Sequence, residues 1–261
     1  MTARDGQLTL RLARDDRDLA AAQRLRYRVF VEELGASGPL VDHQARLEKD
    51  VHDALCDHLL LIDPQRDPAS LDDVVGVYRL LQGAKLPAGA SFYSESEYDL
   101  TALRQSGRRL LELGRSCVEP AYRGGTAMLH LWNGLADYTL SNKIEVLFGV
   151  ASFHGTDLEA LAQPLAYLHH NHLAPPPLRV TAIGDQARAM DRMEPEMVDR
   201  RAAMLATPAL IKAYLRLGGV VGEGAYLDRD FNTTDVCLLI DISQMSEKHR
   251  AFYTRKADRP S

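Results

Sequence analysis

The order of the apolar runs along the chain constrains the fold more than any other feature. After an alternating strand pattern at residues 8–12 and a helical pattern, two short apolar runs cover residues 57–63 and 74–81. Only the turn-rich stretch 64–73 separates these two runs, and a connection this short joins antiparallel neighbours. Hairpins therefore precede the first long crossover. The sequence predicts a mixed α/β sheet rather than a doubly wound parallel one.

The rest of the chain continues this mixed order. With 261 residues, the chain fits a single domain over residues 1–261, with a helical insertion at about 185–217. The stretch 185–205 within it is charged, rich in Met and predicted to be helical. Further strands are predicted at residues 110–118, 144–151, 178–183 and 235–242, and helices at 19–34, 126–142, 158–169 and 209–217.

Composition excludes several classes of protein. A net charge of −5 argues against a dedicated nucleic-acid binder. No run approaches 18 apolar residues, and residues 1–17 carry too many charges for a signal-peptide core. Cys56, Cys117 and Cys237 lie far apart, which predicts neither a disulfide framework nor a metal site. We expect a cytoplasmic protein.

Arginine dominates the basic residues, with 25 Arg among 31 basic side chains. One explanation is anion recognition, because guanidinium groups bind carboxylates and phosphates in a bidentate manner. The other is the codon usage of a GC-rich genome. Composition cannot separate the two, so each arginine has to be judged by its position.

Residues 111–128 combine a strand, a proline stop and a glycine loop that enters a helix. Backbone amides at such an entry bind phosphate, and glycine allows close approach. The segment V-x-P-x-Y-R-G, residues 118–124, resembles the start of the acyl-CoA pyrophosphate loop of the GNAT (acetyltransferase-like) superfamily. That loop continues as R-x-x-G-x-G/A, whereas Thr126 and Met128 stand at the two glycine positions. The resemblance therefore implies an acyl donor on a different phosphopantetheine carrier. The implied donor loop comprises Val118, Tyr122, Arg123, Gly124, Gly125 and Thr126.

A second set of motifs resembles the acyl-homoserine lactone synthases, which take acyl groups from acyl carrier protein. The motifs are R-x-x-x-F in LRYRVFVEELG, E-x-D-x-x-D beginning at Glu48, the arginine of VYRLL, and ELGR, in which Gly114 replaces a serine. The tryptophan of that family is missing near Ala36. The resemblance implies that substrate is bound by Arg26, Phe30, Asp50, Asp53, Arg79 and Arg115.

Over residues 8–243 the chain is most similar to the acyl-carrier-protein-dependent ornithine N-acyltransferases. The shared segments are YRVFVEELG, ELGRSCVEPAYRGGT and YLRLGGVVGEGAYLDRDFNTTDVCLLID. The resemblance implies a GNAT-like acyltransferase fold, with a central twisted mixed sheet flanked by helices. It also implies transfer of a (3-hydroxy)fatty acyl group from acyl carrier protein to the α-amine of L-ornithine, giving lyso-ornithine lipid. The expected partners are acyl carrier protein and the amino-acid acceptor, with peripheral contact to the inner membrane for product release and no cofactor besides the phosphopantetheine thioester.

The chemistry of N-acylation singles out Glu112. The reaction needs a base for the amine and hydrogen-bond donors for the oxyanion. Glu112 lies on the predicted central strand beside the donor loop, so it is the first candidate for the base; the alternative is an ion pair with Arg115. Asp50 and Asp53 either hold the cationic amino acid or belong to a solvated loop.

Several arginines also need negatively charged partners. Arg79 and Arg115 lie on apolar strands, where an unpaired guanidinium is costly, so we expect an internal pairing network. The sequence also predicts contacts with the acidic surface of acyl carrier protein by charge complementarity. The arginines concerned are Arg26, Arg28, Arg108 and Arg109.

Three alternatives to ornithine acylation stay open. The first keeps the mechanism and acylates glutamine or glycine. The second is synthesis of an acyl-homoserine lactone. The third is a non-catalytic protein that binds acyl carrier protein or lipid. Asp228, Asp230 and Asn232 shape either a turn or the acceptor pocket, and carboxylates near the acceptor would favour ornithine.

Overall fold

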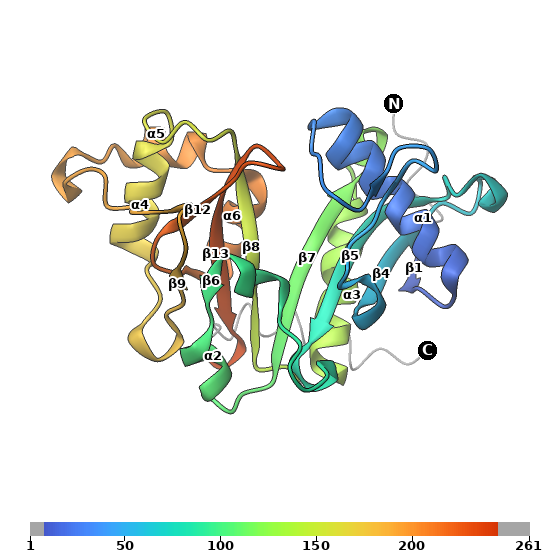
Figure 1. The fold of residues 1–261 in the computed structure, drawn as a ribbon, viewed down its shortest axis with the longest axis horizontal. Coiled ribbons are helices and arrows are strands. Elements are labelled where there is room, and N and C mark those ends of the chain that lie inside the picture. Colours follow the sequence, from blue (N-terminus) through green and yellow to red (C-terminus); the bar gives the residue numbers. More distant parts are fainter. Residues whose placement is uncertain (1–7, 245–261) are drawn as a thin grey trace. The chain divides into compact units, whose positions relative to one another are not determined.

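The computed structural model describes residues 8–244 and divides them into two compact units (Figure 1). The first unit comprises residues 8–86 and 113–143, and the second comprises 87–112 and 144–244. Strand β7 (Leu110–Val118) contributes to both, because the boundary falls between Glu112 and Leu113. The single domain predicted over 1–261 includes ends outside the described residues, and it stays a prediction, as does its insertion.

The first unit is built on the predicted hairpin. β1 (Thr9–Leu12) pairs antiparallel with β4 (Asp57–Ile62), and β4 pairs antiparallel with β5 (Val74–Gln82). β5 is followed in the sheet by β7. Nearly every residue of β4 and β5 is buried, which explains why both read as continuous apolar runs. The predicted strands of this unit are confirmed.

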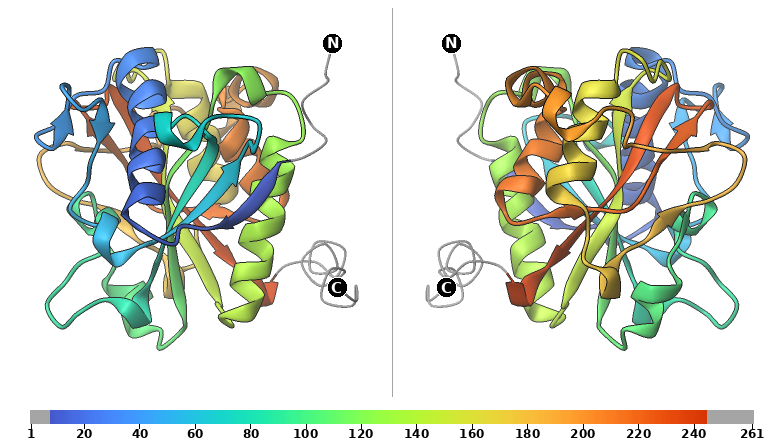
Figure 2. Two further views of the ribbon diagram at one scale, coloured as in Figure 1. Left: turned by 90° about the vertical axis from the view of Figure 1, so that its right-hand side faces the viewer. Right: turned by 90° about the vertical axis from the view of Figure 1, so that its left-hand side faces the viewer.

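Two helices cover this part of the sheet. α1 (Asp16–Arg26) contacts β5, whereas α3 (Ala127–Ser141) contacts β1, β4 and β5, and the two lie on opposite faces (Figure 2). Asp15 caps α1 by accepting the N–H of Asp18. The helical pattern predicted to residue 34 is confirmed, but its last part, Tyr27–Glu33, is a π-helix, a wider turn that is rare outside functional regions.

The second unit continues from the first residues of β7. Its strands follow the order β7, β8, β13, β12 and β10, with the β7–β8 pair parallel and the others antiparallel. β11 pairs with β13, α6 contacts β13, and α4 contacts α5 and β11. The strands are β8 (Val146–His154), β10 (Ala187–Arg188), β11 (Val220–Val221), β12 (Ala225–Asp228) and β13 (Thr233–Asp241). The helices are α2 (Thr101–Gln105), α4 (Ala162–His172), α5 (Arg200–Ala206) and α6 (Ala209–Arg216).

The structure differs from the predicted elements in three places. The strand expected at 178–183 is reduced to β9 (Thr181–Ala182), which pairs with β6 (Tyr98–Asp99), because prolines favour a 3-10 turn before it. The stretch 185–205 is helical only from Arg200. The segment after Pro39, where no strand was predicted, holds the hairpin β2 (Val41–Asp42) and β3 (Leu47–Glu48).

The predicted fold class is confirmed. The chain is a mixed α/β protein whose sheet contains parallel and antiparallel strands and is flanked by helices. Within the described residues, no helix combines the length and apolar character that a membrane crossing requires.

Candidate functional site

A group of buried ion pairs lies in the first unit. Arg26, at the end of α1, is fully buried and pairs with Glu48 of β3 and with Asp53, whose carboxylate lies 2.7 Å from a guanidinium nitrogen. This burial excludes the surface contact with a partner protein that the sequence left open for Arg26. Burying a charge is favourable only when it is paired, and here two carboxylates supply the pairing.

Arg79 and Arg115 extend the group. Arg79 of β5 lies 3.0 Å from an oxygen of Asp50 and 3.3 Å from one of Asp53. Arg115 of β7 lies 2.8 Å from the other oxygen of Asp50 and 3.2 Å from Glu48. The predicted internal network is therefore confirmed. We call the following set the buried ion cluster: Arg26, Glu48, Asp50, Asp53, Arg79 and Arg115.

The two aspartates of this cluster have lowered pKa values. Burial by itself would raise the pKa of Asp50, but hydrogen bonds from His52 and the charges of Arg79 and Arg115 outweigh it and hold that pKa far below its usual range. Burial and the Arg26 charge oppose each other at Asp53 in the same way, and its pKa is also lowered. The alternative of a solvated loop is wrong for both aspartates, because the side chains of Asp50 and Asp53 are only 7% and 5% exposed and pair with guanidinium groups.

The backbone of β7 is bent where it meets the cluster. Arg115 has a φ of 50°, a left-handed conformation that is unusual in a strand and that commonly marks a bulge. The bend falls three residues after Glu112, where the parallel pairing of β7 with β8 that begins at Leu110 ends. Phe30, predicted with this group, is half-buried and packs against the apolar core beside α1.

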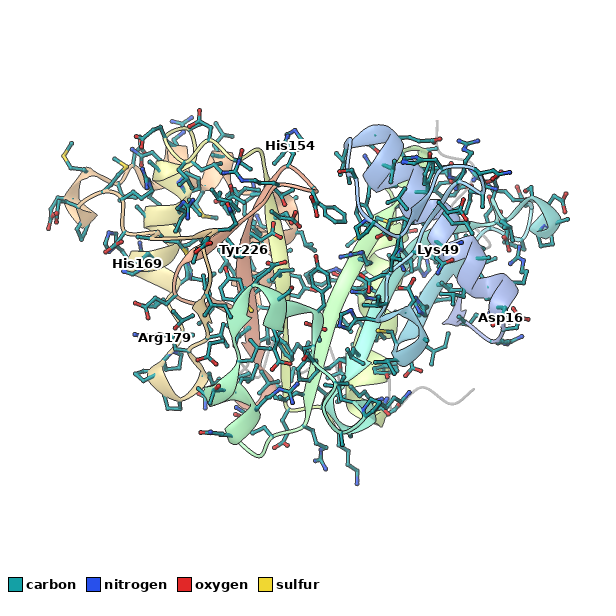
Figure 3. The ribbon with its side chains drawn as sticks, in the orientation of Figure 1. Asp16, Lys49, His154, His169, Arg179 and Tyr226 are labelled. Carbon is teal, nitrogen blue, oxygen red and sulfur yellow. The ribbon has the colours of Figure 1, made fainter. Side chains whose placement is uncertain are left out.

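Two histidines contact the cluster, and the sequence motifs missed both. His52 lies three residues after Lys49, which is labelled in Figure 3. The Nδ1 of His52 lies 3.0 Å from an oxygen of Asp50. The side chain of His52 is 19% exposed. His58 lies 3.0 Å through Nε2 from the carbonyl of Asp53 and is buried, and burial lowers its pKa. The available signal was their position inside and just after E-x-D-x-x-D.

The predicted donor loop forms one continuous segment between β7 and α3. Val118 ends the strand, and its carbonyl accepts a hydrogen bond of 2.9 Å from Arg123. The guanidinium of Arg123 also binds Glu33 at 2.6 Å. Gly124 has a φ of 79°, which glycine adopts without strain. The remaining members are Tyr122, which is buried and donates to Asp63, Gly125, which is exposed, and Thr126, which is the N-cap position of α3.

Thr126 supports a binding role for this segment. Its side chain makes no capping hydrogen bond, and its hydroxyl has no hydrogen-bond partner among the described residues. The first amides of α3 also have no acceptor within the helix, as at any helix start. A hydroxyl and several amides at a helix N-terminus suit a phosphate group.

Glu112 belongs to the second unit. It is 4% exposed, and its two oxygens accept the backbone N–H groups of Tyr93 and Ser94 at 3.0 Å and 2.7 Å. Arg115, the ion-pair partner that the sequence left open for Glu112, pairs with Glu48 and Asp50. The prediction that Glu112 is the base stays a prediction.

Three further carboxylates meet in the second unit. One oxygen each of Glu97, Asp228 and Asp235 lies within 4.8 Å of the others, and we call this set the acidic cluster. Glu97 and Asp235 are buried, and Asp228 is half-buried. Burial, followed by these negative charges, raises the pKa of Tyr226, which lies on β12 and is labelled in Figure 3. Carboxylates grouped in this way attract a cation such as an ammonium group.

The sequence identified only one member of this group. It named Asp228 with Asp230 and Asn232, and the turn it proposed is confirmed, because Asp228 accepts the N–H groups of Asp230 and Phe231. Glu97 and Asp235 escaped notice because they lie far from each other in sequence and follow no motif.

The arginines expected at a partner surface have intramolecular partners instead. Arg28 contacts Glu119 at 3.1 Å, and Arg108 contacts Asp241 at 2.7 Å. Arg109 has the most exposed side chain of these, at 56%, and lies 3.9 Å from Glu145. Arg28 and Arg108 are half-buried and Arg109 is exposed, and binding of acyl carrier protein by these arginines stays a prediction.

Comparison with known proteins identifies relatives along nearly the whole chain. Residues 25–133 match the family described as "Acetyltransferase (GNAT) domain". The L-ornithine N(alpha)-acyltransferase of Rhodobacter capsulatus is 63% identical over 249 residues, which is 95% of this chain and 95% of that protein. The protein of the same name from Agrobacterium fabrum is 41% identical over 98% of this chain and 88% of its own length.

A solved structure supports the fold. The CoA-dependent acyl-homoserine lactone synthase BjaI, solved with SAM and isopentyl-CoA, aligns with a TM-score of 0.54 and 14% identity, covering 98% of this chain and 92% of that one. At this identity the similarity shows a shared fold.

Proposed function

The chain belongs to the L-ornithine N(alpha)-acyltransferase family, and from this membership we propose that it transfers a fatty acyl group from acyl carrier protein to the α-amine of L-ornithine. It is an acyltransferase of the GNAT fold. The observation that carries the proposal is 63% identity along 95% of both chains. The proposed acyl chain is a (3-hydroxy)fatty acid and the product is lyso-ornithine lipid, a single-chain amphiphile released at the inner membrane.

The loop before α3 supports a phosphopantetheine donor. Its exposed Gly124 and Gly125, the hydroxyl of Thr126 and the first amides of α3 together suit one phosphate. Phosphopantetheine on acyl carrier protein carries a single phosphodiester, whereas coenzyme A adds a pyrophosphate and a nucleotide. The replacement of two motif glycines by Thr126 and Met128 favours the carrier protein as donor.

The acidic cluster supports ornithine as the acceptor. Ornithine carries an ammonium group on its side chain, and glutamine and glycine do not. Three carboxylate oxygens within 4.8 Å suit such a cation by charge and by hydrogen bonding. Glutamine and glycine carry no side-chain charge that could pair with these carboxylates.

The buried ion cluster has a different proposed part. Its aspartates are already paired with guanidinium groups, so they hold the geometry next to the donor loop rather than binding a separate ammonium. Because Arg115 is anchored on two sides, the bend of β7 ahead of Val118 is fixed. Arg26, Phe30, Asp53 and Arg79 contribute to substrate binding through this frame.

A parallel acyl-transfer assay tests the proposal. The purified protein receives 3-hydroxyacyl carrier protein or the matching acyl-CoA, together with ornithine, glutamine, glycine or S-adenosylmethionine, and products are identified by mass. We expect acyl-ornithine from the carrier-protein donor. Acylation of glutamine or glycine alone would overturn the acceptor, and equal use of acyl-CoA would overturn the donor.

A single charge removal tests the acceptor contact. Asp228→Asn keeps an oxygen to accept the N–H groups of Asp230 and Phe231 but removes the negative charge. We expect the KM for ornithine to rise about tenfold, which corresponds to about 1.4 kcal/mol, with kcat changed less. The matched control is Asp230→Asn on the exposed side of the same turn, which should leave the KM unchanged. Equal KM values for the two variants would exclude the contact.

A further inference from the structure

His52 and Asp50 form a pair at the rim of the buried ion cluster. The Nδ1 of His52 lies 3.0 Å from an oxygen of Asp50, and the backbone N–H of His52 donates to the same oxygen at 2.7 Å. The oxygens of Asp50 also bind Arg79 and Arg115, which come from β5 and β7. Asp50 is therefore fixed from several sides, and it fixes the imidazole ring in turn.

This arrangement determines which nitrogen of a neutral His52 carries the lone pair. An ionised carboxylate accepts hydrogen bonds only, so the Nδ1 facing Asp50 carries the proton. The lone pair then lies on Nε2. A carboxylate that orients a histidine and stabilises its protonated form is the arrangement that enzymes use for general bases.

Comparison with the neighbouring histidines distinguishes His52. His58 contacts the same cluster, but it is 4% exposed and its Nε2 faces the carbonyl of Asp53. His43 lies near the cluster in sequence, but its Nδ1 faces the hydroxyl of Tyr27 at 3.0 Å. Of these three, His52 alone combines a carboxylate partner with a side chain that is 19% exposed.

We propose that His52, oriented by Asp50, is the proton acceptor for the acceptor amine during acyl transfer. The inference rests on the proposed function, because it assumes an amine acceptor and a thioester donor. The neutral amine attacks the thioester carbon, and a C–N bond forms. The nitrogen then gives its extra proton to Nε2 of His52. As the C–S bond breaks, the imidazolium returns this proton to the departing thiolate, so the amide and the free thiol are formed without net proton uptake.

The charged groups around His52 are compatible with this role. Asp50 stabilises the imidazolium directly, while Arg79 and Arg115 are neutralised by Asp50, Asp53 and Glu48. Each oxygen of Glu112, the base expected from sequence, accepts one backbone N–H, from Tyr93 or from Ser94. We therefore infer that Glu112 holds this turn and that His52 moves the proton.

The test measures kcat/KM for ornithine as a function of pH. The rate is monitored through the release of the free thiol. Towards acid pH, the wild-type rate should fall with a slope of two, because both the attacking amine and the general base must be unprotonated. His52→Gln should show a slope of one, and its kcat should be lower than that of the wild type by a factor of about 100 or more. The matched control, His43→Gln, should keep the slope of two and a rate within about threefold of wild type.

Three further variants complete the test. His52→Ala should regain rate when imidazole is added, whereas His43→Ala should not respond. Glu112→Gln keeps one oxygen for the turn and should retain the slope of two. A slope of two in His52→Gln, or a slope of one in Glu112→Gln, would overturn the proposal. If the wild type acylates ornithine and His52→Gln keeps the wild-type rate and slope, this inference alone is overturned. If the wild type acylates none of the acceptors, the proposed function is overturned.

Discussion

At the scale of single residues, the decisive property is how each buried charge is paired. Arg26 has no exposed surface and two carboxylate partners, whereas Arg46 lies on the surface with Glu32. The two arginines come from the same part of the chain and both form ion pairs. They differ in solvation, because water screens the exposed pair and is absent from the buried one.

Removal of these two side chains should therefore have unequal effects. Arg26→Ala leaves Glu48 and Asp53 buried without that counter-charge and should lower the free energy of unfolding by about 3–5 kcal/mol. The matched variant Arg46→Ala should change it by less than about 1 kcal/mol. Urea unfolding at neutral pH measures both. Similar midpoints for the two variants would contradict the assignment of Arg26 to the interior.

At the scale of elements, the glycine-rich stretch before β12 is explained by close packing. The N–H of Gly222 donates to the carbonyl of Cys237 on β13 at 2.8 Å. A Cβ at this position would lie 2.6 Å from the side chain of Val180 and 2.9 Å from its backbone oxygen. Backbone cannot give way as a side chain can, so only glycine allows these segments to approach so closely.

Gly222→Ala tests this packing. The added methyl group should lower the free energy of unfolding by about 1–3 kcal/mol, because Val180 has to shift. Gly38→Ala is the control, since a Cβ there would lie 3.7 Å from Val41, an ordinary contact. Thermal unfolding of both variants gives the comparison. An unchanged midpoint for Gly222→Ala would show that the segments pack less closely.

At the scale of the whole molecule, ion pairs couple stability to pH. Several carboxylates have a lowered pKa because arginines bind them; at Asp241, the hydrogen bonds from Arg108 lower the pKa to about 2. An unfolded aspartate titrates near 3.9. The stabilisation by Asp241 is therefore complete above about pH 4, and it is lost as the pH falls towards 2.

Asp241→Asn should reveal this dependence. Above pH 4 the variant should be less stable than the wild type, because the neutral amide lacks the charge that binds Arg108. Between pH 4 and pH 2 the difference should shrink, since the wild-type carboxylate becomes neutral as well. Urea midpoints measured from pH 5 to pH 2.5 give the comparison. A constant difference across this range would contradict a charge-based contribution.

Much of the fold follows from local sequence patterns. The period of apolar residues located β4, β5, β7 and α3 within a few residues, because each buries a face that the pattern records directly. The predictions of a strand at 178–183 and of a helix at 185–205 were wrong over most of their length. The structure of such short segments depends on neighbours that are distant in sequence.

The candidate site divides in the same way. The motifs identified Arg26, Asp50 and Arg79, but only the tertiary structure showed that they pair with one another, since a charged residue in a sequence does not reveal its partner. His52 stands at an unspecified position of a motif and Glu97 lies in none, so their chemistry arises from what the fold places beside them. Sequence determined the periodic elements and the family motifs, because both are local along the chain. The fold decided burial, pairing and orientation, because these depend on distances in space.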